Sequence, residues 1–124
     1  MSDLGIVIIS HSKQLAQGIV DIIREVAKDI PLTYIGGTED DGIGSSFDGV
    51  QIAVEANPAN KLLAFYDLGS ARMNLELVGE TTNKELFIQN VAMVEGAYIA
   101  AALLQAGVTT DSILKQLEEL AIKK

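Results

Sequence analysis

His11 is the only histidine of this 124-residue chain, and it follows almost directly on the apolar run of residues 4–9. An imidazole nitrogen is nucleophilic at neutral pH, so one such side chain can accept and return a phosphoryl group if its tautomer and orientation are fixed. A helix is expected to begin just after His11, and its unpaired first-turn N–H groups would stabilise an anion there. These features predict that His11 is transiently phosphorylated. The alternative is an ordinary exposed histidine in a loop.

Asp67 follows a second apolar run, residues 61–66, as His11 follows the first. If the two runs are neighbouring parallel strands, the carboxylate would lie beside the imidazole. It would then hold one ring nitrogen as a donor and leave the other as the nucleophile. We expect Asp67 to orient His11. Capping of the helix that follows is the alternative role for this carboxylate, and one side chain can serve both.

Small and hydroxyl-bearing residues accompany both strand ends. Gly69 and Ser70 follow Asp67, where a glycine lets the backbone approach a ligand and a hydroxyl can donate to a phosphate oxygen. Residues 36–38 and 42–46 bring similar donors, although such residues also build ordinary turns and caps. We expect phosphate contacts from Ser12, Gly37, Gly69 and Ser70, and contacts with a partner protein from the loop that contains Gly42, Gly44 and Ser45.

Apolar patterns predict the elements that position these residues. Runs rich in β-branched side chains predict strands over residues 4–9, 32–35 and 61–66, and a shorter run suggests a fourth strand over 86–88. Apolar side chains three and four residues apart predict the helices, with proline after each of the first two. Five helices are expected. The first begins with a serine near its N-cap and runs to about residue 29, and the next three lie over 46–57, through 73–78 and over 93–105. The last lies over 109–120, with Thr109 or Thr110 as its N-cap.

The alternation of strands and helices indicates an α/β fold with an open, mainly parallel sheet of about four strands and helices on both faces. Ligands bind such sheets beyond the carboxyl ends of the strands, which here are residues 10–12, 36–46 and 67–70. No linker or repeat divides the sequence, so we expect one domain over residues 1–124.

Composition argues against several classes of function. The formal charge of −8 repels nucleic acid, and the acidic excess is either a solvated surface or a means to orient a basic partner. One histidine and no cysteine leave only carboxylates as metal ligands, so no metal site is expected. The glycines that begin at Gly42 do not form a dinucleotide fingerprint, because the third glycine position is Phe47, and no Walker loop is present. We therefore expect this chain to bind no cofactor itself.

The first residues lack a basic stretch, and no apolar run approaches the ~20 residues of a membrane span. A soluble cytoplasmic protein without membrane association is expected.

Four stretches together resemble the DhaM family, the phosphotransfer subunits of phosphoenolpyruvate-dependent dihydroxyacetone kinase. They are LGIVIISHS at 4–12, GGT at 36–38, GIGS at 42–45 and DLGSARMN at 67–74, and the resemblance spans nearly the whole chain. The strand-end histidine and aspartate are also similar to the enzyme IIA domains of mannose-type sugar phosphotransferase systems. Those domains typically have a Gly-Gly-Ser-Pro-like stretch after the aspartate, where this chain has Leu68-Gly-Ser-Ala71, and this difference favours the dihydroxyacetone system.

The resemblance implies that His11 takes a phosphoryl group from phospho-HPr and passes it to ADP on a nucleotide-binding subunit, DhaL. ATP made there, with Mg²⁺ on that subunit, would phosphorylate dihydroxyacetone on a third subunit, DhaK. Some family members carry further HPr-like and enzyme I-like domains, which act as their own phosphoryl donors. This sequence has no stretch that resembles them, so separate donor proteins are expected for this chain. The family also implies a homodimer, with which the apolar helix over residues 97–106 is compatible, although that helix could equally be core.

Three other functions stay open. One is the enzyme IIA component of a mannose-type sugar transport system, which uses the same chemistry. Another is a receiver-like signalling domain phosphorylated on Asp67, but a receiver needs acidic residues after its first strand to hold Mg²⁺, and here residues 10–12 are Ser-His-Ser. The last is a non-catalytic interaction module built on the same sheet.

Overall fold

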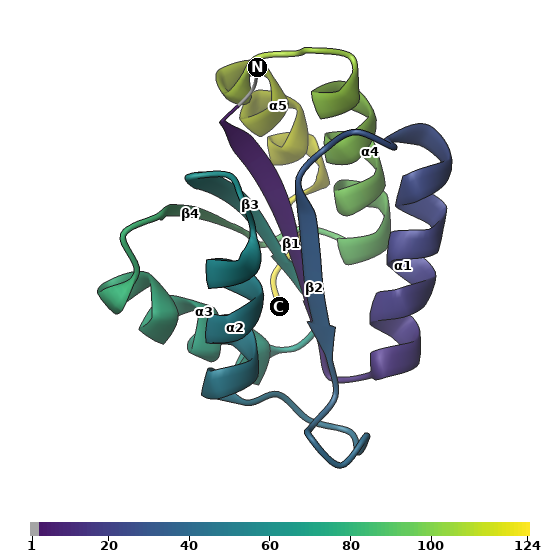
Figure 1. Cartoon of the computed structure of the whole chain (residues 1–124). Coiled ribbons are helices and arrows are strands. Elements are labelled where there is room, and N and C mark those ends of the chain that lie inside the picture. The colour runs from purple at the N-terminus through teal and green to yellow at the C-terminus, as the bar shows by residue number, and fades with distance from the viewer. Residues whose placement is uncertain (1–2) are drawn as a thin grey trace.

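The computed structural model describes residues 3–124, in which four strands form one sheet with helices on both of its faces (Figure 1). The strand order is β2-β1-β3-β4, and all three neighbouring pairs are parallel. The predicted α/β fold with an open parallel sheet is therefore confirmed, and the fourth strand is one residue longer at each end than expected. The strands are β1 (Leu4–Ser10), β2 (Leu32–Gly36), β3 (Lys61–Tyr66) and β4 (Glu85–Gln89).

Two groups of helices cover the sheet. Helices α1, α4 and α5 pack on one face, and α2 and α3 pack on the other (Figure 1). Each of the five corresponds to a helix expected from the apolar pattern. Their bounds are α1 (Lys13–Val26), α2 (Phe47–Ala56), α3 (Gly69–Thr81), α4 (Met93–Gln105) and α5 (Thr110–Leu117).

Alternate side chains of the central strand β1 enter two separate hydrophobic cores. Ile6 and Ile8 belong to the core under α1 and α4, whereas Val7 and Ile9 belong to the core under α2 and α3. Every residue of β1 is buried, which explains why this strand is a continuous apolar run instead of an alternating one. Each large aliphatic side chain buried in this way stabilises the fold by about 1.5–3 kcal/mol.

The end of α1 differs from the expected one. The helix stops at Val26 instead of near residue 29, because Ala27 leaves the helical backbone with a φ of −142°. The guanidinium of Arg24 then donates to the carbonyls of the turn, at Ala27, Lys28 and Ile30. These bonds satisfy carbonyls at and beyond the helix end, where no helical N–H is available.

The last helix is also shorter than expected. Thr109 is its N-cap, as one of the two predicted candidates, and its hydroxyl accepts the N–H of Ser112 at 3.3 Å. The α-helix ends at Leu117, and a 3₁₀ turn, Glu118–Leu120, replaces the final turn of the predicted helix. Among residues 3–124, no helix has the length and apolar character needed to cross a membrane.

The register of the sheet brings three loops to one edge. Ser10 lies opposite Gly36 across β1 and β2, and Ile9 lies opposite Tyr66 across β1 and β3. The chain therefore leaves all three strands at the same level, with His11 and Asp67 each following a central strand. Gly36 is required there, because a Cβ atom on it would lie 2.4 Å from the carbonyl oxygen of Ser12.

Candidate functional site

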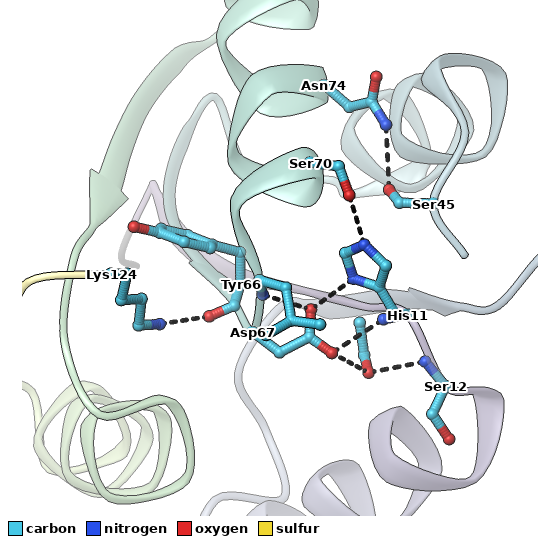
Figure 2. A network of polar contacts seen from close by, with 10 residues as sticks. His11, Ser12, Ser45, Tyr66, Asp67, Ser70, Asn74 and Lys124 are labelled. Carbon is cyan, nitrogen blue, oxygen red and sulfur yellow. Dashed lines mark hydrogen bonds and ion pairs between the residues drawn. The ribbon is translucent and has the colours of Figure 1, made fainter. Parts of the chain in front are cut away.

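His11 and Asp67 form a hydrogen-bonded pair at the carboxyl edge of the sheet (Figure 2). Nδ1 of His11 lies 2.8 Å from Oδ1 of Asp67, and the backbone N–H of His11 donates to Oδ2 at 2.9 Å. The two side chains are only 13% and 14% exposed. The ring and the backbone of His11 thus each bond to one carboxylate oxygen, which holds the imidazole beside the two strand ends.

The Asp67 carboxylate is held by two more donors. The Ser10 hydroxyl donates to Oδ2 at 2.8 Å, and the N–H of Leu68 donates to Oδ1 at 2.7 Å. Burial by itself raises the pKa of Asp67, but hydrogen bonds from the His11 backbone, the His11 ring, Ser10 and Leu68 together bring it below its ordinary value. Asp67 is therefore an anion at neutral pH.

The charge of Asp67 determines the tautomer of His11. An ionised carboxylate has no proton to donate, so Nδ1 of the neighbouring ring must carry the proton in this hydrogen bond. Nε2 is then left with the lone pair in the neutral ring. The geometry thus makes Nε2 the nucleophilic nitrogen of His11.

Helix capping, the alternative role for Asp67, is not observed. The N-cap residue of α3 is Leu68, and no side chain caps the first turn of this helix. The single backbone N–H that Asp67 accepts from the α3 side belongs to Leu68 itself. The carboxylate thus serves mainly the imidazole and backbone of His11.

Nε2 of His11 points towards the start of α3. The Ser70 Oγ atom lies 2.5 Å from Nε2, and because the nitrogen carries a lone pair, the hydroxyl is the donor (Figure 2). Gly69 and Ser70 are the first two residues of α3, and N–H groups at such positions have no partner within their own helix. An anion bonded to Nε2 would meet the Ser70 hydroxyl and the positive end of α3.

This arrangement differs from the one expected at α1. The sequence predicted that the helix after His11 would receive the anion, but Nε2 is directed to α3 instead. Ser12 caps α1, its hydroxyl oxygen accepting the N–H of Leu15 at 3.2 Å, and its own N–H donates to Ser10. In Figure 2 the Ser12 hydroxyl points away from the imidazole ring. The predicted phosphate contact of Ser12 therefore gains no support from this geometry.

The loop that follows β2 is attached to the backbone around His11. Gly37 has a φ of +76°, and its N–H donates to the carbonyl of Ser10 at 3.1 Å. Gly44 donates to the carbonyl of His11 itself at 2.9 Å. Because the Gly37 N–H is already paired, the predicted contact between Gly37 and phosphate is not favoured either. The glycines of this loop hold the segment close to the site.

A further bond joins the loop to α3. The amide of Asn74 donates to the Ser45 hydroxyl at 3.0 Å (Figure 2). The carbonyl of Gly42 accepts the N–H of Thr38 at 3.0 Å, which closes the turn. Asn74 was not among the predicted site residues, although its position one helical turn after Ser70 placed it on the same side of α3. Ser10 was also missed as an Asp67 partner.

Large apolar side chains are exposed on the segments that carry the site. Ile43 in the loop is 79% exposed, Leu68 before α3 is 58% exposed, and Met73 on α3 is 63% exposed. Next to Ile43, an exposed ion pair joins Lys13 and Asp41 at 3.2 Å. Exposed apolar residues on the segments next to a reactive side chain are typical of a protein docking surface. We call Ile43, Leu68 and Met73 the apolar rim.

Comparison with known proteins gives a consistent result. The family model EIIA-man, described as the PTS system fructose IIA component, matches residues 5–114. The chain is 59% identical over 120 residues to the PTS-dependent dihydroxyacetone kinase phosphotransferase subunit DhaM of Lactococcus lactis subsp. lactis, which covers 97% of this chain and 98% of that protein. It is 50% identical over 119 residues to the PEP-dependent dihydroxyacetone kinase 1 phosphoryl donor subunit DhaM of Listeria innocua serovar 6a, with 96% of each chain covered.

Solved structures share the fold. A crystal structure of the unknown function protein EF1359 matches with a TM-score of 0.83 at 28% identity and covers 97% of this chain and 96% of that one. The phosphotransferase system component EIIA from Streptococcus agalactiae matches with a TM-score of 0.69 at 17% identity, covering 94% and 90% of the two chains. The second likeness supports the fold alone.

Proposed function

The chain belongs to the EIIA-man family, the PTS system fructose IIA component, and from this premise we propose that it is the phosphoryl donor subunit of a phosphoenolpyruvate-dependent dihydroxyacetone kinase. Its high identity to the two DhaM subunits, over nearly the whole length of each chain, supports this role. In the proposed reaction His11 is the phosphoryl carrier and phospho-HPr is the donor. The observation that carries the proposal is the contact series from Asp67 through His11 to Ser70.

The first half-reaction loads His11. The lone pair of Nε2 attacks the phosphorus atom of the donor, and the bond between phosphorus and the donor breaks with its electron pair left on the donor. The His11 ring becomes a cation, with its Nδ1 proton held by the Asp67 carboxylate. The Ser70 hydroxyl turns from Nε2 to a phosphoryl oxygen, where the first N–H groups of α3 add to the stabilisation.

The second half-reaction discharges the ring. A terminal phosphate oxygen of ADP attacks the phosphorus atom, and the bond from phosphorus to Nε2 breaks with its electron pair returned to the ring. We propose that ADP and Mg²⁺ are bound by a separate subunit, DhaL, and that DhaK holds dihydroxyacetone. The apolar rim of Ile43, Leu68 and Met73 is suited to close contact with such partners.

A homodimer and a cytoplasmic location stay part of the proposal on the strength of the resemblance alone. The apolar helix that was compatible with a dimer contributes its small residues to the interior of this chain. Ala97, Ala100 and Ala101 of α4 are fully buried in the core beside α1. This helix therefore adds no support for a second copy.

Two alternatives are less well supported. A mannose-type sugar carrier would use the same histidine, but the two curated relatives with the higher identities are both dihydroxyacetone kinase subunits. A receiver-like domain would use Asp67 as the phosphoryl acceptor. Here four hydrogen bonds engage the two oxygens of Asp67, and two of them come from His11.

The test is phosphorylation of the chain by phosphoenolpyruvate, enzyme I and HPr, followed by intact mass measurement. We expect one added phosphoryl group that is labile in acid and stable in base, as phosphohistidine is. A group released by base or hydroxylamine would indicate Asp67 and contradict the proposal.

Discharge identifies the acceptor. The phosphorylated chain should transfer rapidly to an ADP-loaded DhaL subunit and form ATP, with free ADP as a poor acceptor. Transfer to a mannose-type transporter domain, with none to the ADP-bearing subunit, would replace the dihydroxyacetone assignment with the sugar-transport one.

A further inference from the structure

Lys124 lies against the strand end that carries Asp67, on the side away from His11 (Figure 2). Its Nζ atom donates to the backbone carbonyl of Tyr66 at 2.5 Å and lies 4.1 Å from the centroid of the Tyr66 ring. Building on the proposed role of His11, we propose that Lys124 is a positioning residue for phosphoryl transfer, which holds the end of β3 at Tyr66 so that Asp67 stays directed at His11.

Main-chain contacts hold the segment that carries Lys124. After the 3₁₀ turn, the chain returns to the residues that follow β4, where Ala121 forms an antiparallel bridge with Val91. The N–H of Ile122 donates to the carbonyl of Asn90 at 3.0 Å. The side chain of Asn90 also bonds to the hydroxyl of Tyr66. The path that brings the lysine to Tyr66 is therefore defined by backbone bonds and does not depend on the lysine alone.

The contacts of Lys124 suit its ammonium group. Three N–H donors and a full positive charge match a carbonyl oxygen and the face of an aromatic ring. The Tyr66 carbonyl belongs to the peptide group that leads into Asp67, so holding this carbonyl limits the movement of the aspartate backbone. Tyr66 itself is fully buried, which gives the lysine a rigid surface to bind.

Lys124 acts on Asp67 through Tyr66 and not through a direct contact. The Asp67 carboxylate bonds to His11 and Ser10 at the end of β1 and accepts the N–H of Leu68 at the start of α3, whereas Lys124 bonds to the Tyr66 carbonyl.

Loss of the ammonium should act on His11 through the main chain. Burial lowers the pKa of Lys124, and attraction to Asp67 opposes that effect. Without the ammonium, the Tyr66 carbonyl is released and the Asp67 backbone can shift. This shift should weaken the bond that keeps the proton on Nδ1 of His11 and the lone pair on Nε2.

Four variants test this role. Lys124→Gln removes the charge and keeps a donor, Lys124→Met removes both, and Lys124→Arg keeps both. Lys123→Gln is the matched control, because it makes the same change in net charge at the neighbouring exposed residue. The rate of His11 phosphorylation by phospho-HPr is measured for each variant. Imidazole ¹⁵N shifts of the unphosphorylated proteins report the tautomer without any phosphoryl transfer.

We expect Lys124→Gln and Lys124→Met to slow phosphorylation about two- to five-fold, because the lost hydrogen bond acts on the site only through Tyr66. Their ¹⁵N spectra should show loss of the single Nδ1–H tautomer. Lys124→Arg and Lys123→Gln should resemble the wild type in both measurements.

Two results would overturn the proposal: an unchanged rate and ¹⁵N spectrum in Lys124→Gln and Lys124→Met, or equal effects from Lys123→Gln. A lower melting temperature with unchanged ¹⁵N spectra would assign Lys124 to stability alone and also overturn it. The ¹⁵N spectra keep the two proposals separate. If the wild type accepted no phosphoryl group, the proposed function would fail, whereas the tautomer comparison would still decide the role of Lys124.

Discussion

Nδ1 of His11 lies 2.8 Å from Oδ1 of Asp67, although the two residues are 56 positions apart in the sequence. The contact exists because β1 and β3 are parallel neighbours, with Ile9 opposite Tyr66 at their carboxyl ends. One residue supplies a nucleophilic ring, and the other determines which ring nitrogen is free to react. The predictions below separate these two contributions.

Replacement of the histidine tests the carrier. His11→Ala should abolish phosphoryl uptake from phospho-HPr, because the reactive nitrogen is gone, while the fold is kept. The side chain lies at the edge of the sheet and belongs to neither hydrophobic core. Intact mass gives the uptake, and circular dichroism gives the fold. Normal uptake by a folded variant would place the phosphoryl group on another residue.

Replacement of the aspartate tests orientation. Asp67→Ala should slow phosphoryl transfer in both directions by roughly ten- to a hundred-fold without eliminating it, since misorientation weakens a nucleophile but leaves it present. Rapid-quench measurements of loading and discharge give the two rates. Asp111→Ala, at an exposed aspartate in the first turn of α5, is the control and should behave as the wild type. Equal rates in the two variants would reduce Asp67 to a structural role.

Replacement of Ser70 tests whether the N-terminal end of α3 stabilises the phosphoryl group. Ser70→Ala removes the hydroxyl that contacts Nε2 and, in the proposed reaction, a phosphoryl oxygen. A hydrogen bond to a charged group contributes about 1.5–3 kcal/mol, so we expect the loading rate to fall by roughly ten-fold or more. Ser112→Ala, in the first turn of α5, serves as the matched control. A Ser70 variant with an unchanged rate would return α1 to consideration as the helix that receives the anion.

The hydrogen bonds of Asp67 predict a pH dependence of stability. The pKa of Asp67 in the folded chain is below its ordinary value of 3.8, so the carboxylate stabilises the fold above that pH and loses this effect as pH falls through the folded value. Asp67→Asn should therefore cost more free energy of unfolding near neutral pH than at about pH 3. Urea unfolding at the two pH values measures both differences. A cost that grows as the pH falls would contradict the sign.

The apolar rim predicts an effect on docking that is separate from any effect on folding. Ile43→Asp should raise the KM for phospho-HPr several-fold with little change in the melting temperature, because the side chain is 79% exposed and adds little to the core. Ile52→Asp is the control, since Ile52 is 66% exposed on α2 and lies outside the rim. An equal rise in KM for both variants would indicate a general effect of added negative charge.

Local patterns in the sequence were enough to predict the order of the elements. The fully buried β1 reads as a continuous apolar run, and α1 has the three- and four-residue spacing of a half-buried helix. Local chemistry also placed His11 and Asp67 at strand ends, because each polar residue stops an apolar run. The predicted ends of the helices were less accurate, as at Val26 and Leu117, because side-chain bonds and 3₁₀ turns decide where a helix stops.

By itself, then, the sequence determined the class of fold, the lone nucleophile and the aspartate expected beside it, since these depend on residue type and short-range spacing. Tertiary structure decided which groups meet. The strand order brings His11 to Asp67, and the ring direction set by that carboxylate turns Nε2 towards Ser70 on α3 and not towards α1. The position of Lys124 beside Tyr66 likewise depends on the path of the chain after α5. Hydrogen bonds between side chains are directional and short, so packing over long sequence separations selects their partners.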